Sequence, residues 1–291
     1  MTETVVGVIG GSGLYQIEGL EDAEWRSVQG PWGTPSDQIL TGRLAGISMA
    51  FLPRHGRGHR VPPTEINYRA NIDALKRVGV TDIISISAVG SFREEMAPGD
   101  FVMVDQFIDR TVNREKTFFG DGCVAHVSMA HPVCGRLHAA LTRAATREGI
   151  KHHAGGTYLA MEGPQFSSLA ESHMYRELWG CDVIGMTNMP EAKLAREAEI
   201  CYATVAMVTD YDSWHPDHGE VDVPSILKVM HENVEKAKTL ISTIVPDLGA
   251  AREPCPYGCD RALDYALITA PEARDPLVLA KLDAVAGRVL T

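Results

Sequence analysis

The sequence contains no long hydrophobic run: nowhere in its 291 residues do the roughly 18 uninterrupted apolar residues of a membrane-spanning helix occur. The first residues, Met-Thr-Glu-Thr-Val-Val-Gly-Val-Ile, also lack the basic start of a secretory signal. A membrane protein and an exported protein are therefore both disfavoured. We expect a cytoplasmic protein with no membrane partner.

Basic residues are outnumbered, with 27 Lys and Arg against 38 Asp and Glu and a net charge of −11. A protein whose main partner is nucleic acid carries a strongly basic surface, so this class is excluded. One small anion-binding pocket remains compatible with this negative net charge. Disorder over the whole length is excluded too, because 45% of the residues are hydrophobic and only 22% are charged.

The two common nucleotide-binding motifs are missing. A glycine-rich turn, Gly7-Val-Ile-Gly-Gly-Ser-Gly13, follows the first predicted strand, but Gln16 stands where a dinucleotide motif starting at Gly11 needs glycine. No Gly-Lys-Ser/Thr sequence follows the turn, so a Walker A motif is excluded as well. Two interpretations remain open: a plain tight turn, or an anion-binding turn that carries the Ser12 hydroxyl.

Cysteines are few, and their spacing does not form a recognised metal motif. The six are Cys123, Cys134, Cys181, Cys201, Cys255 and Cys259. We expect the first four to be reduced, buried thiols. The last two form a C-P-Y-G-C pair, but no second cysteine or histidine pair follows at zinc spacing, so no metal site is predicted. A surface turn with two idle or occasionally oxidised thiols is the expectation.

Short apolar runs alternate with longer helical patterns, and there is no internal repeat or long linker. Strands are predicted at 5–9, 47–52, 82–87, 101–104, 157–161, 182–185 and 202–209, and helices at 64–78, 132–149, 168–180, 191–198, 223–244 and 276–289. This alternation predicts an α/β protein with a mainly parallel or mixed central sheet flanked by helices. A Pro-, Gly- and Ala-rich stretch at 246–256 separates a main domain, 1–250, from a C-terminal extension, 251–291, which we expect to pack on the same domain.

Cationic side chains are concentrated in one loop, Arg54-His-Gly-Arg-Gly-His-Arg60, directly after a predicted strand. Guanidinium groups suit phosphate or carboxylate, and sites in α/β proteins usually lie at strand ends. The loop therefore favours anion binding. A solvated basic loop, or arginines paired with acidic neighbours at a subunit contact, is the alternative.

Three more strand ends carry side chains suited to binding a ligand. Ser85–Ser91 supplies small hydroxyl residues that suit phosphate oxygens, and Thr187 adds another hydroxyl before Glu191, which also fits a first helical turn. Phe166, presented by a Gly-Pro turn, either stacks on a flat heterocycle or anchors its own loop.

Two carboxylates, Asp210 and Asp212, follow the apolar strand 202–209. In an extended segment, side chains at this spacing point to the same side of the chain. Such a pair can share a proton, which raises one pKa and creates a general acid near neutral pH. A metal site and a solvated turn are the alternatives.

Together these motifs resemble the nucleoside phosphorylase family, and in order and spacing its branch that acts on 5′-methylthioadenosine. The matching segments are Gly-Gly-Ser-Gly, Arg-His-Gly-Arg-x-His, Asn-Tyr-Arg-Ala-Asn, Ala-Val-Gly-Ser, Glu-Gly-Pro-Gln-Phe, Met-Thr-x-x-Pro-Glu and Thr-Asp-Tyr-Asp-Ser-Trp, within residues 4–248. The resemblance implies a single α/β domain around a distorted mixed sheet. It also implies a homotrimer, or a hexamer of two trimers, with sites at subunit contacts.

The resemblance assigns roles to individual residues. For phosphate it implies Ser12, Arg54, His55, Ser87, the backbone of Ala88, and Thr187. For the nucleoside it implies Met186 against the ribose, Phe166 stacked on the purine, Ser167 near the base, Asp210 and Asp212 at the purine edge, and Val223 and a neighbouring subunit's His126 near the 5′ substituent. Ser12 and Ser87 stand where the family commonly has threonine, and Gln165 replaces a frequent arginine.

The implied reaction is phosphorolysis of 5′-methylthioadenosine to adenine and 5-methylthio-α-D-ribose 1-phosphate, with Asp210 as the general acid at purine N7. Inorganic phosphate is the co-substrate, and neither a metal nor an organic cofactor is required. Because carboxylates accept hydrogen bonds from a 6-amino group, Asp210 and Asp212 favour adenine, with adenosine as a second substrate. The alternatives are a phosphorylase of 6-oxopurine nucleosides or methylthioinosine, a nucleosidase that uses water, and a non-catalytic purine- or phosphate-binding module.

Overall fold

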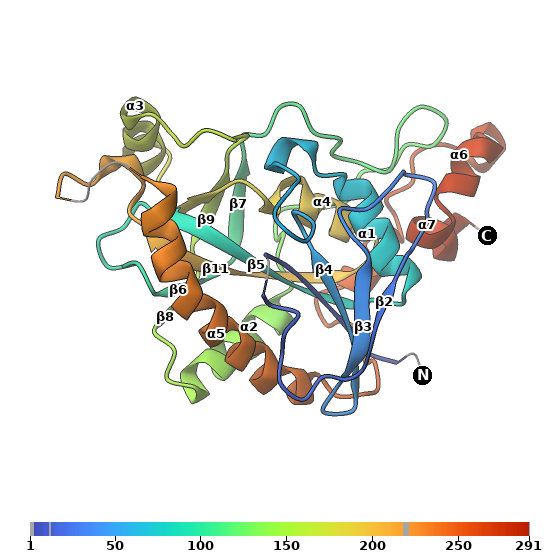
Figure 1. Ribbon diagram of the computed structural model, residues 1–291. Helices are drawn as coiled ribbons and strands as arrows, with labels where there is room; N and C mark the ends of the chain where they lie inside the picture. The colour runs from blue at the N-terminus through green and yellow to red at the C-terminus, as the bar shows by residue number, and fades with distance from the viewer. Residues whose placement is uncertain (1–2, 12, 218–220, 291) are drawn as a thin grey trace.

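A single mixed β-sheet runs through the computed structural model, which describes residues 3–11, 13–217 and 221–290 (Figure 1). Its strands are β1 (Val5–Gly10), β2 (Glu21–Arg26), β3 (Ile39–Leu44), β4 (Ile47–Pro53), β5 (Asp82–Ser91), β6 (Phe101–Val104), β7 (Gln106–Asp109), β8 (His152–Ala154), β9 (Thr157–Ala160), β10 (Val183–Gly185) and β11 (Cys201–Asp210). Eight of them follow the order β2-β3-β4-β1-β5-β10-β9-β7, and β11, β6 and β8 branch from β5. The predicted α/β architecture with a mixed, distorted central sheet is confirmed.

The branch point is β5, which has three neighbouring strands. Its first half pairs in parallel with β1, and its end pairs antiparallel with β10 through Gly90 and Ser91. The opposite edge pairs in parallel with β11 along almost its whole length. The carboxyl ends of β5 and β11 therefore meet beside β10, where three predicted site segments begin.

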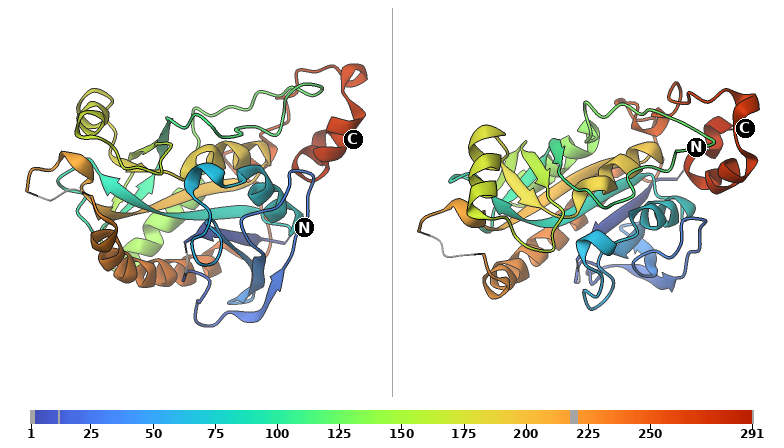
Figure 2. Two further views of the ribbon diagram at one scale, coloured as in Figure 1. Left: turned by 45° about the horizontal axis from the view of Figure 1, so that its top comes forward. Right: turned by 90° about the horizontal axis from the view of Figure 1, so that it is seen from above.

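Helices cover both faces of the sheet. They are α1 (Tyr68–Arg77), α2 (Gly135–Arg147), α3 (Leu169–His173), α4 (Asn188–Glu197), α5 (Val223–Leu248), α6 (Pro276–Lys281) and α7 (Asp283–Leu290), with shorter turns η1 (Pro63–Glu65), η2 (Met174–Leu178), η3 (Asp212–Trp214), η4 (Cys259–Arg261) and η5 (Pro271–Ala273). α2 and α5 pack on one face and α1 and α4 on the other, while α6 and α7 lie at the end of the molecule far from α3 (Figures 1 and 2).

Strand β11 illustrates why both faces are buried. Its odd-numbered residues Ala203, Val205 and Met207 pack with α2 and α5, whereas Tyr202 and Val208 pack with α1 and α4. Since neighbouring side chains on a strand point to opposite faces, a strand covered on both sides must be apolar throughout. This is the pattern from which the strand was predicted.

Several predicted element boundaries are wrong. Three predicted helices are each divided in two: 64–78 into η1 and α1, 168–180 into α3 and the wider π-helical turn η2, and 276–289 into α6 and α7. Helix α5 continues to Leu248, with Pro246 inside its last turn, so the chain is helical where the predicted boundary at 246–256 begins. Gly249, at a φ of 70°, ends the helix in a conformation that favours glycine.

Four strands were not predicted: β2, β3, β7 and β8. β2 is almost entirely exposed and carries three acidic residues, so it lacks the apolar pattern of a strand. β8 has only three residues and is ordered by pairing with β6. Short edge strands such as these depend on their partner strand, which periodicity in one segment does not reveal.

The C-terminal residues 251–290 pack against the rest of the chain. Leu263, Leu282 and Ala286 are buried in the same cluster as α1 and α4. Arg288 forms an ion pair with Glu199 at 2.6 Å. No helix among the described residues is both long and apolar enough to cross a membrane.

Candidate functional site

The predicted acid pair lies where β11 ends. Asp210 is the last residue of that strand and pairs with Gly90 of β5, after a register shift that follows Val208. A Cβ atom at position 90 would lie 2.8 Å from Oδ1 of Asp210. Gly90 therefore provides the space into which the Asp210 carboxyl group folds.

The extended geometry predicted for Asp210 and Asp212 is wrong. Asp212 opens the short helix η3 at a φ of 51°, so the chain turns away from the strand between the two carboxylates. The backbone N–H of Asp212 donates to Oδ1 of Asp210 at 2.8 Å, and the Thr209 hydroxyl donates to Oδ2 at 2.8 Å. The two residues are thus linked through a backbone amide, with no hydrogen bond between the two carboxyl groups.

Burial changes the acid–base behaviour of Asp210. Desolvation raises its pKa above the ordinary value, against hydrogen bonds from Thr209 and Asp212 that lower it. A carboxyl group with a raised pKa keeps its proton to higher pH, which is what a general acid needs.

Asp212 has different partners and is buried. The hydroxyl of Ser167 donates to its carboxylate at 2.7 Å, and the Ser172 hydroxyl donates at 2.5 Å. The Ser213 hydroxyl donates a 2.8 Å hydrogen bond to the Ser167 carbonyl. These hydrogen bonds hold the predicted base-binding loop against η3. The neighbouring residue Phe166 is 42% exposed.

Two predicted phosphate-site hydroxyls meet. The Oγ of Ser87, in β5, lies 3.1 Å from Oγ1 of Thr187, which follows β10 and caps α4. Tyr158 of β9 places its hydroxyl 3.3 Å from Ser87. Ala88 is the next residue on β5, and Met186 precedes Thr187. Two motif segments therefore meet the acid pair at the ends of β5, β10 and β11.

Arg54 is not a free cation. It is 2% exposed, and its guanidinium binds both carboxylate oxygens of Glu191, at 2.8 and 3.0 Å. It also donates to the Ile86 carbonyl at 2.9 Å and to the Ser85 hydroxyl at 2.6 Å. Although burial acts to lower the pKa of Arg54, the Glu191 carboxylate raises it above the ordinary value. Most of its donors are therefore used within the protein.

A second arginine of the same loop is also paired. Arg57 binds the Asp37 carboxylate at 2.8 Å and lies 4.1 Å from the centre of the Trp25 ring. Arg54 and Arg57 are both paired with acidic neighbours, which was the alternative interpretation of the basic loop. That interpretation placed the acidic neighbours at a subunit contact, whereas in the structure they belong to the same chain.

His55 is held as a neutral ring. Burial lowers its pKa to about 4, and its Nδ1 lies 2.9 Å from the Val61 carbonyl. Its ring stacks on His59, with the centroids 4.1 Å apart. With Nδ1–H donating to the carbonyl, Nε2 is an acceptor for a hydrogen-bond donor such as a protonated phosphate oxygen.

Two predicted site residues, His126 and Val223, are not joined to this cluster, and Ser12 lies outside the described residues. Gly10, two residues before it, accepts a 2.9 Å hydrogen bond from the Arg54 amide. His126 is exposed, and its amide donates to Ala266 of the C-terminal segment. Val223 begins α5 and is 57% exposed.

Two residues that position the site were missed. Glu191, interpreted as a first-turn residue, is the partner of Arg54. Arg114, in no motif, is buried and donates to the carbonyls of Met186 and Met189 and to the Glu162 carboxylate. The available signal for Glu191 was its place at the end of the Met-Thr-x-x-Pro-Glu motif. Nothing in the local pattern marks Arg114.

The expectation of a surface turn for Cys255 and Cys259 is wrong. Both are buried, and they lie with Cys134 and Cys201 in one group. Among the described residues, this is the group of side chains that could hold a metal ion, and it lies at the first residue of β11, the end opposite Asp210.

Comparison with known proteins identifies the family of the chain. The sequence model of the Phosphorylase superfamily matches residues 5–246. An S-methyl-5′-thioadenosine phosphorylase of Cereibacter sphaeroides is 69% identical over 288 residues, which cover 99% of this chain and 99% of the relative. The whole length of the chain, including residues after 250, is therefore shared with that relative.

Solved structures have the same fold. A methylthioadenosine phosphorylase from an antarctic soil metagenomic library superimposes with a TM-score of 0.91 at 46% identity, covering 98% of this chain and 99% of the other. A variant of the Schistosoma mansoni adenosine/methylthioadenosine phosphorylase, in complex with adenine, has a TM-score of 0.84 at 36% identity, covering 89% and 97%. The protein is a member of the phosphorylase superfamily, with a purine nucleoside phosphorylase-type fold.

Proposed function

We propose that the protein catalyses phosphorolysis of 5′-methylthioadenosine to adenine and 5-methylthio-α-D-ribose 1-phosphate. The observation that carries the proposal is the buried Asp210, with its raised pKa, at the same sheet edge as the Ser87–Thr187 hydroxyl pair. The 69% identity to a phosphorylase of this substrate supports the choice of nucleoside. The reaction returns adenine to purine salvage and the sugar phosphate to methionine salvage.

In this reaction the bond between C1′ and N9 breaks while a phosphate oxygen bonds to C1′ from the opposite face. Positive charge develops on the ribose and negative charge on the purine. Asp210 donates its proton to purine N7 and so neutralises the leaving group, an effect that typically contributes about 10²–10⁴-fold to a rate. Phosphate beneath the sugar stabilises the developing oxocarbenium charge.

The phosphate site has few free cations, since Arg54 is paired with Glu191. In this proposal phosphate is bound by the Ser12, Ser87 and Thr187 hydroxyls, the Ala88 amide, the neutral His55 and the remaining donor capacity of Arg54. Hydroxyl and amide donors stabilise an anion by directed hydrogen bonds in a buried site. No metal or organic cofactor enters the mechanism.

Adenine is the base that the site suits. The Asp212 carboxylate and the carbonyl oxygen of protonated Asp210 accept from a 6-amino group, whereas a 6-oxo group needs a donor there. The hydroxyls of Ser167 and Ser172 hold the Asp212 carboxylate in place. Adenosine is the proposed second substrate, and the adenosine/methylthioadenosine phosphorylase of Schistosoma mansoni supports it.

The 5′ end of the site is completed in this proposal by His126 of a second copy, in a homotrimer, together with Val223. Both side chains are exposed in the single chain, as a subunit contact requires. Analytical ultracentrifugation gives the assembly, and His126→Ala should raise KM for methylthioadenosine while the assembly persists. A monomer in solution would refute this part of the proposal.

The activity is tested by adenine release from methylthioadenosine with and without phosphate, beside adenosine and inosine. We expect release that requires phosphate and is fastest with methylthioadenosine. Release without phosphate would identify a nucleosidase, and faster cleavage of inosine would identify a 6-oxopurine enzyme. Binding without release would leave only a binding module.

A further inference from the structure

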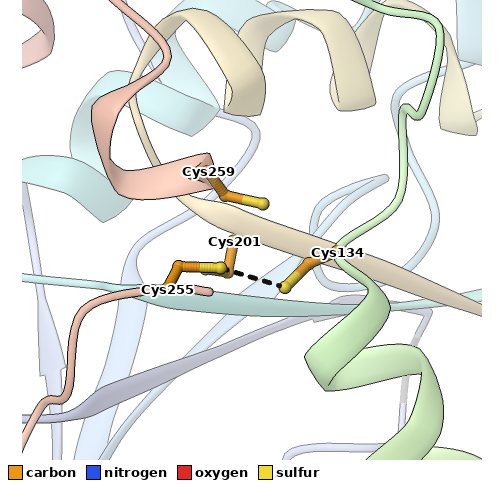
Figure 3. Close-up of side chains that lie close together, drawn as sticks. All are labelled: Cys134, Cys201, Cys255 and Cys259. Atoms are coloured by element: carbon orange, nitrogen blue, oxygen red, sulfur yellow. Dashed lines mark hydrogen bonds between the residues drawn. The ribbon is translucent and has the colours of Figure 1, made fainter. Parts of the chain in front are cut away.

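Four cysteines from three distant segments converge on one point (Figure 3). Cys134 precedes α2, Cys201 begins β11, and Cys255 and Cys259 lie in the C-terminal segment. Their four sulfur atoms all lie within 4.8 Å of one another, and all four residues are buried.

The spacing fits a tetrahedral metal site. The sulfurs of Cys134 and Cys255 are 3.7 Å apart. Four thiolates at the usual zinc–sulfur distance of about 2.3 Å have sulfurs separated by about 3.8 Å. A disulfide brings only two sulfurs together, at about 2.05 Å, and gives no reason for four to share one centre.

The backbone holds the last two ligands in place. Gly258, at a φ of 67°, donates to the Cys255 carbonyl at 2.9 Å and turns the chain so that Cys259 returns toward Cys255. The Asp260 carboxylate accepts from the Cys255 amide at 2.9 Å. Side chains pre-positioned in this way bind a metal with little ordering of the chain.

Cations lie next to the sulfurs. Arg252 donates to the Cys201 sulfur at 3.0 Å and forms an ion pair with the fully buried Asp82 at 3.3 Å. Arg136, the second residue of α2, binds the same carboxylate. A charged donor on sulfur favours the thiolate, which is the form that binds metals. Outer-shell hydrogen bonds of this kind support known metal sites.

A cavity borders the group. Its volume is about 700 Å³, and it is lined by Cys259, by Tyr257 and Gly258 of the turn, and by Val133 and Gly135 on either side of Cys134. One of the four cysteines therefore lines this cavity.

We propose that Cys134, Cys201, Cys255 and Cys259 bind one zinc ion as a structural tetrathiolate site. The ion fastens the C-terminal segment to the start of α2 and to the first residue of β11. Because all four positions of a tetrahedral zinc ion are filled by sulfur, the site offers no place for substrate and its role is stability. The inference is independent of the proposed catalytic activity.

The test is the metal content of the full-length protein, expressed with zinc and purified under reducing conditions without chelator. Elemental analysis should give about one zinc per chain, and cobalt replacement should give the visible absorption of tetrahedral cobalt thiolate. Cys259→Ser and Cys255→Ser should lose the metal. The matched controls Cys123→Ser and Cys181→Ser, which alter buried cysteines outside the group, should retain it.

Removing the metal from the unaltered protein avoids the risk that a variant fails to fold. A strong chelator should lower Tm, and added zinc should restore it, with no such response in the Cys259→Ser protein. The proposal is overturned if the protein carries no metal and its thiols react freely, or if peptide mapping finds disulfides among these cysteines. Metal retained in full by Cys259→Ser would overturn it as well.

Discussion

The backbone N–H of Asp212 donates a 2.8 Å hydrogen bond to the carboxyl Oδ1 of Asp210. Because this bond comes from the turn into η3, the position of Asp212 sets the orientation of the Asp210 carboxyl group. The side chain of Asp212 is in turn held by Ser167 and Ser172. One residue thereby orients the proposed proton donor through its backbone, and its side chain is the proposed contact to the base.

Replacing the proposed acid tests its role directly. Asp210→Asn removes the proton donor at nearly unchanged size, and kcat should fall by about 10²–10⁴-fold. The kcat is measured by adenine release from methylthioadenosine, and the control is Asp217→Asn, a substitution at an exposed residue. A variant with more than a tenth of the normal kcat would exclude Asp210 as the general acid.

The same residue predicts a pH profile. Burial raises the pKa of Asp210, and the acid is active while protonated, so kcat should fall as pH rises through that raised value. The falling limb should lie above the range of an ordinary aspartate and should be missing from Asp210→Asn. An identical limb in both proteins would assign it to another group.

Gly90 is predicted to be needed for the position of Asp210. In Gly90→Ala, the new Cβ would lie 2.8 Å from Oδ1 of Asp210 and 3.2 Å from Cβ of Asp212, so the carboxyl group must move. A displacement of this size should lower kcat/KM by about 10–100-fold. In the control Gly120→Ala the added methyl group meets no atom within 4 Å, and activity should be unchanged. Equal activity of the two variants would contradict the prediction.

Breaking the pair Arg54–Glu191 should be strongly destabilising. Glu191→Gln leaves a buried guanidinium without its charge partner, so the free energy of unfolding should fall by about 3–5 kcal/mol. Arg26→Met breaks a pair with Glu24 in which both side chains are exposed, at 56% and 64%, and should cost about 0–1 kcal/mol. Urea unfolding compares the two. A cost for Glu191→Gln no larger than that for Arg26→Met would show that the buried charge is compensated elsewhere.

Glu197 should make stability depend on pH. Burial raises its pKa from 4.5 to about 7, so in this range the folded protein holds a proton that the unfolded chain releases. The free energy of unfolding should therefore fall as pH rises from about 4.5 to about 7, by up to about 3 kcal/mol. Glu197→Gln should remove this part of the slope.

The measurement is urea unfolding of the wild type, Glu197→Gln and the control Glu235→Gln at several pH values. Glu235 is exposed on α5, and its variant should keep the wild-type slope. The comparison between variants cancels the contribution of every other titrating group. If Glu197→Gln follows the wild-type curve throughout, the carboxyl group is already charged in the fold.

The fold class and the segments that form the candidate site could be read from local patterns in the sequence. Strands such as β11 are apolar throughout because both faces are covered, and that pattern is visible locally. The motifs around Ser87, Ser167, Thr187 and Asp210 identified side chains that the strand ends bring together, because strands of one sheet deliver their following loops to a common edge.

Only the tertiary structure decided how those side chains are paired. Arg54 and Glu191 are 137 residues apart, so the sequence offered no reason to join them, and the loop was interpreted as favouring anion binding. The turn at Asp212 likewise depends on Ser167 and Ser172, which lie 45 and 40 residues away. The cysteines make the same point most clearly. Cys255 and Cys259 lack a metal motif in the chain, and folding supplies Cys134 and Cys201, since local spacing records nothing of contacts between distant segments.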